Sequence, residues 1–81
     1  MKSSPAQLTA FTQAARSRSF SQAARALGVT QSAITQNIAA LEKRMGQQLF
    51  IRRRRGLELT RAAEELFEIT DRMITLAHLA E

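Results

Sequence analysis

The sequence has no cysteine, tryptophan or tyrosine, and only one histidine, one proline and three glycines among 81 residues. The lack of cysteine excludes disulfides and thiolate metal sites, and the lone His78, close to the C-terminal end, disfavours a zinc site. Apolar runs are short and interrupted by Gln, Arg or Ser, so the sequence predicts neither a signal peptide nor a membrane span. We therefore expect one small, cytoplasmic domain that holds no metal or other cofactor.

Positive charge is unevenly distributed along the chain. Residues 1–63 hold eleven of the twelve Lys and Arg residues and only two acids, Glu42 and Glu58, whereas residues 64–81 hold five of the seven acids. A concentrated basic field suggests a polyanion as partner. Charge alone leaves open the alternative of a solvated basic surface.

The stretch FSQAARALGVTQSAITQNIAAL, residues 20–41, is typical of two short helices joined by a tight turn. Ala24 is small where the helices would cross, and Gly28 can adopt the left-handed conformation that ends the first of them. Ile34 would point back from the second helix. This spacing predicts a helix-turn-helix, whose second helix is shaped to enter the major groove of DNA.

Capping and stop signals place the expected elements along the chain. Ser4 can cap a first helix that starts at Pro5. Ser21 and Thr30 can cap the second and third helices, with Val29 filling the corner between them. The expected elements are helices at 5–17, 22–27 and 31–45, a β-hairpin with strands at 49–51 and 57–59 and its tip at 53–56, and a helix from 61 to the end. They form a mainly α winged helix-turn-helix over residues 1–60, followed by a long C-terminal helix over residues 61–81.

The third expected helix has two different faces. Its inward stripe is apolar and consists of Ile34, Ile38, Leu41 and Met45. Its outer face offers amides, hydroxyls and small methyl groups from Ser32, Thr35 at the edge, Gln36, Ala39 and Ala40, together with Lys43. Glutamine can bond two atoms of adenine, and hydroxyls can donate or accept at base edges, so this face is suited to reading DNA. The alternative is that Ala and Gln are simply good helix formers.

The expected hairpin tip carries four consecutive arginines, Arg52, Arg53, Arg54 and Arg55. Because like charges repel, such a run does not stabilise a fold, but it can neutralise phosphates or enter a narrow minor groove. Alternation along a strand turns successive side chains to opposite sides, so we expect about two of them to touch DNA. Arg52 could instead pair with Glu58. A flexible, solubilising loop is the alternative for the whole run.

Capping hydroxyls can have a second use at a DNA surface. Ser21 and Thr30 stand at expected helix starts, where a hydroxyl and the free backbone N–H groups can bind a phosphate. We expect Ser21 above all, and also Thr30, to contact the DNA backbone, with Gln22 and Arg25 adding contacts from the second helix and Lys43 from the third. Capping alone is the alternative.

The last expected helix is apolar over about half of its circumference, which is wider than one docking face needs. A helix of about 20 residues would be about 30 Å long, longer than the small core beneath it. One stripe can dock on the chain's own core while the rest packs against a second copy of the chain; a frayed tail is the alternative. The two adjacent stripes are Ala62, Leu66, Ile69, Met73, Leu76 and Ala80, and Ala63, Phe67 and Ile74. The residues expected at a homodimer interface are Ala63, Leu66, Phe67, Met73 and Ile74.

The sequence contains no catalytic set that we can identify. We find no Ser/His/Asp set, no phosphate-binding glycine loop and no pair of carboxylates in a plausible cleft, since the acids fall on an exposed helix face, so we expect a protein that is not an enzyme. Two rivals to specific DNA binding stay open. One is a protein-interaction module whose basic wing and apolar last helix engage an acidic partner, and the other is an architectural protein that coats DNA of any sequence.

One combination of residues extends over nearly the whole chain. It consists of Leu8 and Phe11, SFSQAARALGVTQSAITQNIAALE from Ser19 to Glu42, Gly46, Leu49 and Phe50, Arg52, and Leu59 and Thr60. In this combination the chain resembles the N-terminal DNA-binding domain of LysR-type transcriptional regulators. The resemblance implies a winged helix-turn-helix followed by a linker helix, which pairs antiparallel with that of a second subunit. It also implies binding to partly palindromic operators, with activation or repression of transcription.

The resemblance also assigns roles to single residues. Gln31, Ser32, Thr35 and Gln36 match positions that contact bases or nearby phosphates. Ser21 matches a hydroxyl that contacts the backbone, and Arg52 with its neighbours matches the wing.

Several residues depart from the family pattern. Ser32 stands where many relatives have Pro, and Gln36 stands where many have Arg. Without that arginine a favoured guanine reader is lost, so the operator preference should lean towards A·T pairs or rest on the wing. Ala63 replaces a common Gly and should stiffen the linker helix, and the arginine run replaces a shorter wing pattern. Full-length relatives carry a C-terminal domain that senses a small-molecule effector, so this chain is expected to be an excised domain, with a natural short protein as the alternative.

Overall fold

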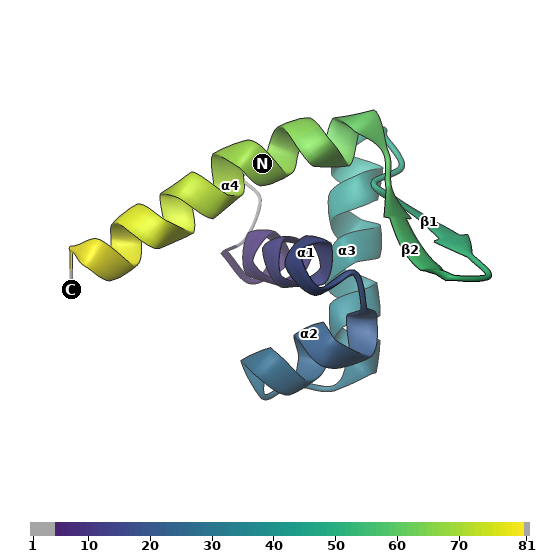
Figure 1. Cartoon of the computed structure of the whole chain (residues 1–81), viewed down its shortest axis with the longest axis horizontal. Coiled ribbons are helices and arrows are strands. Elements are labelled where there is room, and N and C mark those ends of the chain that lie inside the picture. The colour runs from purple at the N-terminus through teal and green to yellow at the C-terminus, as the bar shows by residue number, and fades with distance from the viewer. Residues whose placement is uncertain (1–4, 81) are drawn as a thin grey trace.

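The computed structural model describes residues 5–80, whose arrangement is shown in Figure 1. The elements in order are α1 (Pro5–Ser17), α2 (Phe20–Leu27), α3 (Gln31–Met45), β1 (Phe50–Arg53), β2 (Gly56–Leu59) and α4 (Arg61–Leu79). The first three helices pack together, the hairpin lies beside them, and α4 crosses α1 and extends away from the body. This confirms the expected mainly helical winged helix-turn-helix followed by a long helix. The expected cap Ser4 lies outside the described residues.

The turn between α2 and α3 forms as the sequence predicts. Gly28 adopts a left-handed conformation with a φ of 68°, and the N–H of Val29 donates to the carbonyl of Ala24 at 3.0 Å. Thr30 caps α3, because its Oγ1 accepts from the N–H of Ala33 at 3.0 Å. The expectation that Val29 fills the corner is wrong: the turn directs this side chain to solvent, and it is 46% exposed.

The second helix begins two residues earlier than expected. Its N-cap is Ser19, not Ser21, since Ser19 has extended backbone and its Oγ accepts from the N–H of Gln22 at 3.1 Å. Either serine can cap, and the burial of Phe20 decides between them. A cap at Ser19 places Phe20 in the first turn, where it packs into the core. Ser21 therefore lies within the first turn of α2 and is exposed.

A cluster of three aromatic rings joins the wing to the helices. Phe50, the first residue of β1, lies 5.6 Å from Phe11 of α1 and 5.4 Å from Phe20 of α2, measured between ring centroids. Buried alanines on α1 and α2 belong to the same core, and their small side chains allow the helices to approach closely. The buried apolar core consists of Ala10, Phe11, Ala14, Ala15, Phe20, Ala23, Ala24, Ile34, Ile38, Leu41, Leu49, Phe50 and Ala63.

The inward stripe of α3 ends one turn earlier than expected. Met45 is 39% exposed, whereas the three residues before it in the stripe are buried. The chain returns to the core at Leu49 instead, whose side chain is fully buried. The N–H of Leu49 donates to the carboxylate of Glu42 at 2.8 Å, which fixes this return against α3.

The wing is an antiparallel hairpin in which Phe50 pairs with Leu59 and Arg53 pairs with Gly56. The two residues between the strands, Arg54 and Arg55, form the turn, so the arginines lie at the tip as expected.

Strand register determines which arginine meets Glu58. Glu58 lies opposite Ile51, and residues two apart on a strand share a face, so Arg53 is the diagonal neighbour of Glu58. Its NH2 donates to the Glu58 carboxylate at 3.1 Å. The expectation that Arg52 pairs with Glu58 is wrong, because Arg52 lies on the opposite face, across from Leu57.

The N-terminal half of α4 docks on the body. Ala63 is fully buried in the core, and Thr70 is buried against α1, where its hydroxyl is hydrogen-bonded to that of Thr12 at 2.8 Å. An ion pair between Arg16 and Asp71 joins the same two helices. Ala63 therefore offers no surface to a second chain, and its expected place in a dimer interface is wrong.

The C-terminal half of α4 extends beyond the three-helix body, as Figure 1 shows. Ile69, Met73, Leu76 and Leu79 are all more than half exposed. The wide apolar band of this helix is thus divided: Ala63, Leu66 and Phe67 pack in or against the chain's own core, whereas the stripe of Ile69, Met73, Leu76 and Leu79 is uncovered. No helix within residues 5–80 has both the length and the apolar character that crossing a membrane requires.

Candidate nucleic-acid interface

The face of α3 that sequence analysis assigns to base reading is open to solvent. Gln31, Ser32, Thr35 and Gln36 are all exposed and follow one another along its first two turns. Thr35 Oγ1 donates to the carbonyl of Gln31 at 3.1 Å, and Gln36 Nε2 donates to Ser32 Oγ at 3.4 Å. The remaining amide N–H and the amide and hydroxyl oxygens are turned to solvent, where they can meet base edges.

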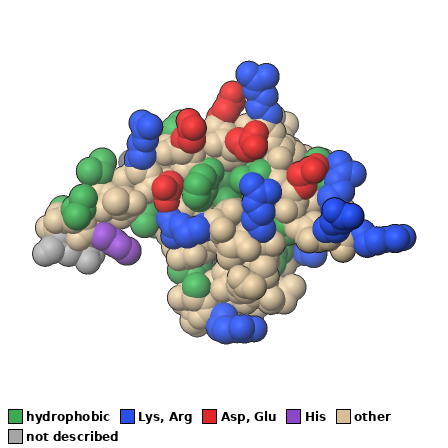
Figure 2. Space-filling model, viewed as in Figure 1, with side chains coloured by type: hydrophobic (Ala, Val, Ile, Leu, Met, Phe, Trp, Pro, Cys, Tyr) green, Lys and Arg blue, Asp and Glu red, His purple; other side chains and the backbone are tan. Residues whose placement is uncertain are grey.

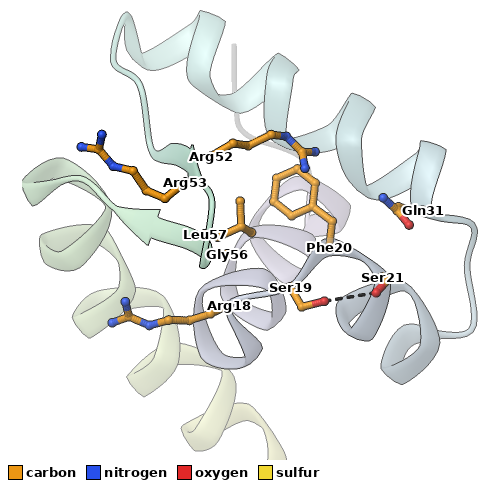
Figure 3. A pocket seen from close by; sticks show the side chains of 9 residues that line it. All are labelled: Arg18, Ser19, Phe20, Ser21, Gln31, Arg52, Arg53, Gly56 and Leu57. Atoms are coloured by element: carbon orange, nitrogen blue, oxygen red, sulfur yellow. Dashed lines mark hydrogen bonds between the residues drawn. The ribbon is translucent and has the colours of Figure 1, made fainter.

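A hollow of about 340 Å³ lies where α2, α3 and the wing meet, as shown in Figure 3. Its lining residues are Arg18, Ser19, Phe20, Ser21, Gln31, Arg52, Arg53, Gly56 and Leu57. Four of them, Ser21, Gln31, Arg52 and Arg53, are residues that the sequence predicts at DNA. The first turn of α3 and the base of the wing therefore border one concave surface.

Arg52 is held against the helix-turn-helix by a ring. Its guanidinium carbon lies 5.0 Å from the ring centroid of Phe20, within the range of a cation–π interaction. Because Phe20 is anchored in the core, this contact restrains Arg52 between the wing and α2. The guanidinium stays exposed, so its N–H groups can still donate to a phosphate.

The other wing arginines are not equivalent. Arg53 is paired with Glu58, and since both side chains are more than half exposed the pair adds little stability. Arg54 and Arg55 form the exposed turn and take part in no ion pair with any other residue in the range 5–80. They are therefore the wing cations most available to an anion.

The predicted backbone-contacting residues on the helices fall into two groups. Ser21 lines the hollow, with its Oγ 3.2 Å from that of Ser19, and Thr30 directly precedes Gln31. Gln22 and Lys43 are exposed, but neither lines the hollow. Of these four residues, Ser21 alone lines the hollow, and Thr30 adjoins Gln31, which is predicted to read bases.

Two residues of this surface, Arg18 and Ser19, are not among those predicted from the sequence. For Ser19 a signal existed, because a cap directly before Phe20 allows this phenylalanine to enter the core. For Arg18 no signal existed: its φ is 54°, a left-handed backbone that only glycine or asparagine would have suggested.

Charge is separated between the wing and α4. Figure 2 shows a group of basic side chains at the wing end of the molecule, whereas most of the acidic side chains lie along the edge formed by α4, with some basic ones among them. These acids are Glu64, Glu65, Glu68 and Asp71. No group of potential metal-ligating side chains occurs within residues 5–80. A polyanion would therefore be attracted to the wing side of the molecule and repelled from α4.

A second concave surface lies beside the bare half of α4. It is an apolar groove of about 260 Å³ between the start of α1 and α4, lined by Pro5, Leu8, Thr9, Thr70, Met73, Ile74 and Ala77. Of the residues predicted at a dimer interface, Met73 and Ile74 line this groove. Leu66 and Phe67 instead pack partly against the chain's own core.

A helix-turn-helix whose second helix exposes uncharged hydrogen-bonding groups, with a basic hairpin beside it, defines a winged helix-turn-helix DNA-binding domain. Residues 5–64 match the family described as bacterial regulatory helix-turn-helix protein, lysR family. The chain belongs to this family of LysR-type transcriptional regulators.

Curated relatives share this segment. The chain is 52% identical over 62 residues to the HTH-type transcriptional activator AmpR of Yersinia enterocolitica, a match that covers 76% of this chain and 21% of that protein. It is 42% identical over 74 residues to the HTH-type transcriptional regulator YofA of Bacillus velezensis, covering 91% of this chain and 26% of that protein. The chain thus spans between a fifth and about a quarter of the length of these relatives, which are transcriptional regulators, a class without enzymatic activity.

Solved structures show the same arrangement. The oxidized form of OxyR from Corynebacterium glutamicum matches with a TM-score of 0.87 at 31% identity, over 96% of this chain and 24% of that chain. The DNA-binding domain of CbnR in a complex with DNA matches with a TM-score of 0.80 at 36% identity, over 91% of this chain and 85% of that chain.

Proposed function

We propose that this chain binds a specific operator in double-stranded DNA and serves as the DNA-binding part of a LysR-type transcriptional regulator. The observation that carries the proposal is the exposed, uncharged polar face of α3 with an arginine-rich wing beside it. The complex of CbnR with DNA, which this chain matches over nearly all of the CbnR domain, supports it.

In the proposed complex, α3 enters one major groove. Gln31, Ser32, Thr35 and Gln36 then face base edges, where amides favour adenine and hydroxyls accept or donate at several bases. Because these side chains are neutral, they contribute discrimination between bases rather than attraction to DNA in general.

The surrounding residues hold the DNA backbone. Ser21 and Thr30, at or beside helix starts, offer hydroxyls and free N–H groups to phosphates. Arg52 reaches the backbone from its place over Phe20, while Arg54 and Arg55 reach a flanking phosphate or the adjacent minor groove. Lys43, Gln22 and Arg53 add further contacts to the DNA backbone.

We further propose that two copies of the chain pair through α4. The uncovered stripe of Ile69, Met73, Leu76 and Leu79, together with the groove at Met73 and Ile74, supports this, because exposed apolar area of this kind is otherwise costly in water. A two-fold dimer presents two copies of α3 to two half-sites, so the operator is expected to be partly palindromic. In the full-length protein, working in the cytoplasm, the rest of the chain would respond to a small-molecule effector.

Selection from a random pool of DNA duplexes tests the proposal. The expected result is enrichment of a short sequence repeated in inverted orientation at a fixed spacing. Tight binding without any enrichment would instead indicate an architectural protein that coats DNA. Failure to bind any duplex at low salt would indicate a protein-interaction module.

A further inference from the structure

The corner between α1 and α2 holds a residue in a strained backbone conformation. Arg18 has a φ of 54° and is the one non-glycine residue with a positive φ within residues 5–80. Its N–H donates to the carbonyl of Ala14 at 2.8 Å and closes the last turn of α1. In this left-handed region the Cβ atom crowds the neighbouring carbonyl, so glycine would be more stable here than arginine. The requirements of the fold do not explain the arginine.

The side chain of Arg18 makes no contact that would offset this strain. It is exposed, and it takes part in no hydrogen bond or ion pair with the other residues in the range 5–80. Arg16, two residues earlier, is different because it pairs with Asp71 and joins α1 to α4. Strain that persists without a compensating contact within the chain is typical of a functional position.

Arg18 faces the wing across a basic hollow of about 410 Å³. The lining residues are Arg18, Arg53, Arg54, Arg55, Gly56, Leu57 and Glu58. Four of the seven are arginines, and the single carboxylate, Glu58, is already bonded to Arg53. In Figure 3 the side chain of Arg18 extends away from Gln31, on the side of the molecule where the wing lies.

Arginines gathered around one hollow repel each other unless an anion lies between them. Guanidinium groups donate to phosphate oxygens in a fixed planar geometry, and DNA supplies phosphates at regular spacing. We propose that this hollow is a phosphate subsite, in which Arg18 and the wing arginines hold one stretch of the DNA backbone from two sides. Arg18 is thereby a determinant of affinity for DNA of any sequence, an assignment that rests on the proposed DNA binding and extends it.

Three variants separate the charge of Arg18 from its backbone strain. Arg18→Gln removes the charge and keeps a side chain in the left-handed conformation. Arg18→Gly removes both the charge and the strain. Arg72→Gln removes one exposed charge from α4, away from the wing, and serves as the matched control.

Binding to a fluorescent random-sequence duplex is measured over a series of salt concentrations. We expect the log–log salt slope of both Arg18 variants to be shallower by about 0.9, the value of one phosphate contact, and that of Arg72→Gln to stay at the wild-type value. Between about 50 and 200 mM salt, the wild-type affinity should therefore fall about threefold more than that of Arg18→Gln. Without DNA, Arg18→Gly should unfold roughly 4 °C higher than the wild type, because the strain is relieved.

A salt slope of Arg18→Gln equal to that of the wild type would overturn the phosphate subsite while leaving DNA binding itself intact. A lower unfolding temperature of Arg18→Gly with an unchanged slope would assign Arg18 to the fold and overturn the subsite as well. If the wild type bound no duplex at low salt, the proposed function would be wrong and the subsite would fall with it.

Discussion

The exposed face of α3 and the wing lie side by side but differ in charge: the first is neutral and the second is strongly basic. The face of α3 presents neutral amides and hydroxyls, and those of Ser32, Thr35 and Gln36 are hydrogen-bonded to neighbours on the same helix. The wing presents four consecutive arginines, of which Arg53 alone is paired with an acid among residues 5–80. Neutral groups can distinguish base edges but attract DNA weakly from a distance, whereas arginines attract any DNA without distinguishing its sequence. From this difference we infer that specificity and affinity for DNA lie in separate elements, so that mutation should alter them independently.

The largest effect is expected where the two regions are joined. Phe50→Ala removes the ring that connects the wing to Phe11 and Phe20, and it should lower the free energy of unfolding by about 3–5 kcal/mol. Denaturant titration measures this loss. Val29→Ala, at an exposed corner, is the control and should stay within about 0.5 kcal/mol of the wild type. If Phe50→Ala lowered the free energy of unfolding no more than the control does, the packing of the wing on the helices would not depend on this aromatic contact.

The next largest effect is expected from separating the two copies of the chain in the proposed dimer. Ile69→Glu combined with Met73→Glu places charges on the bare stripe of α4 and should produce monomers in sedimentation. Affinity for a duplex with two half-sites should fall about 10²–10⁴-fold, because the second contact is no longer intramolecular. Binding to one half-site should not change. Glu68→Gln is the control on the same helix, and an unchanged sedimentation mass of the double variant would refute pairing through this stripe.

A smaller effect, confined to specificity, is expected on α3. Gln31→Ala combined with Gln36→Ala removes both amides, and the affinity for the selected operator should fall about 10- to 100-fold. Affinity for random duplex should stay nearly constant, since neither residue carries charge. Competition binding against both duplexes measures the ratio. Equal losses for the two duplexes would mean that these glutamines do not read bases.

The smallest effect at low salt is expected from the tip of the wing. Arg54→Ala combined with Arg55→Ala should make the log–log salt slope shallower by roughly two, about one for each lost phosphate contact. The ratio of operator to random affinity should stay near its wild-type value, in contrast to the glutamine variant. Arg61→Ala, whose side chain pairs with Glu65 on α4, is the matched control. A slope equal to that of the wild type would show that the tip stays off the DNA.

Helix boundaries could be predicted where only one nearby residue is suited to begin or end the helix. Gly28 and Gly46 both adopt left-handed conformations at the ends of helices, and Thr30 caps α3, as their positions in the sequence indicate. Ser19 and Ser21 are a different case. Both can cap, and only the burial of Phe20 within the assembled core selects the first.

The details of the site depended on register and packing, which local sequence does not encode. The partner of Glu58 follows from the opposition of Ile51 and Glu58 across the hairpin, so a pattern of four identical arginines could not reveal it. Which apolar residues of α4 are buried depends on which side of the helix meets α1. The helical spacing of apolar residues in the sequence does not decide between the two sides. The left-handed backbone of Arg18 has no signal in its residue type at all.

The hydroxyl pair of Thr12 and Thr70 has a consequence beyond stability. This bond is buried and joins two long helices at one point, so it fixes the rotational phase of α4 about its own axis. A shift of one residue would turn that helix by about 100° and direct its bare stripe elsewhere. In a dimer built on that stripe, the phase sets the angle between the two copies of α3. Two threonine hydroxyls would therefore help to determine how many base pairs separate the half-sites of the operator.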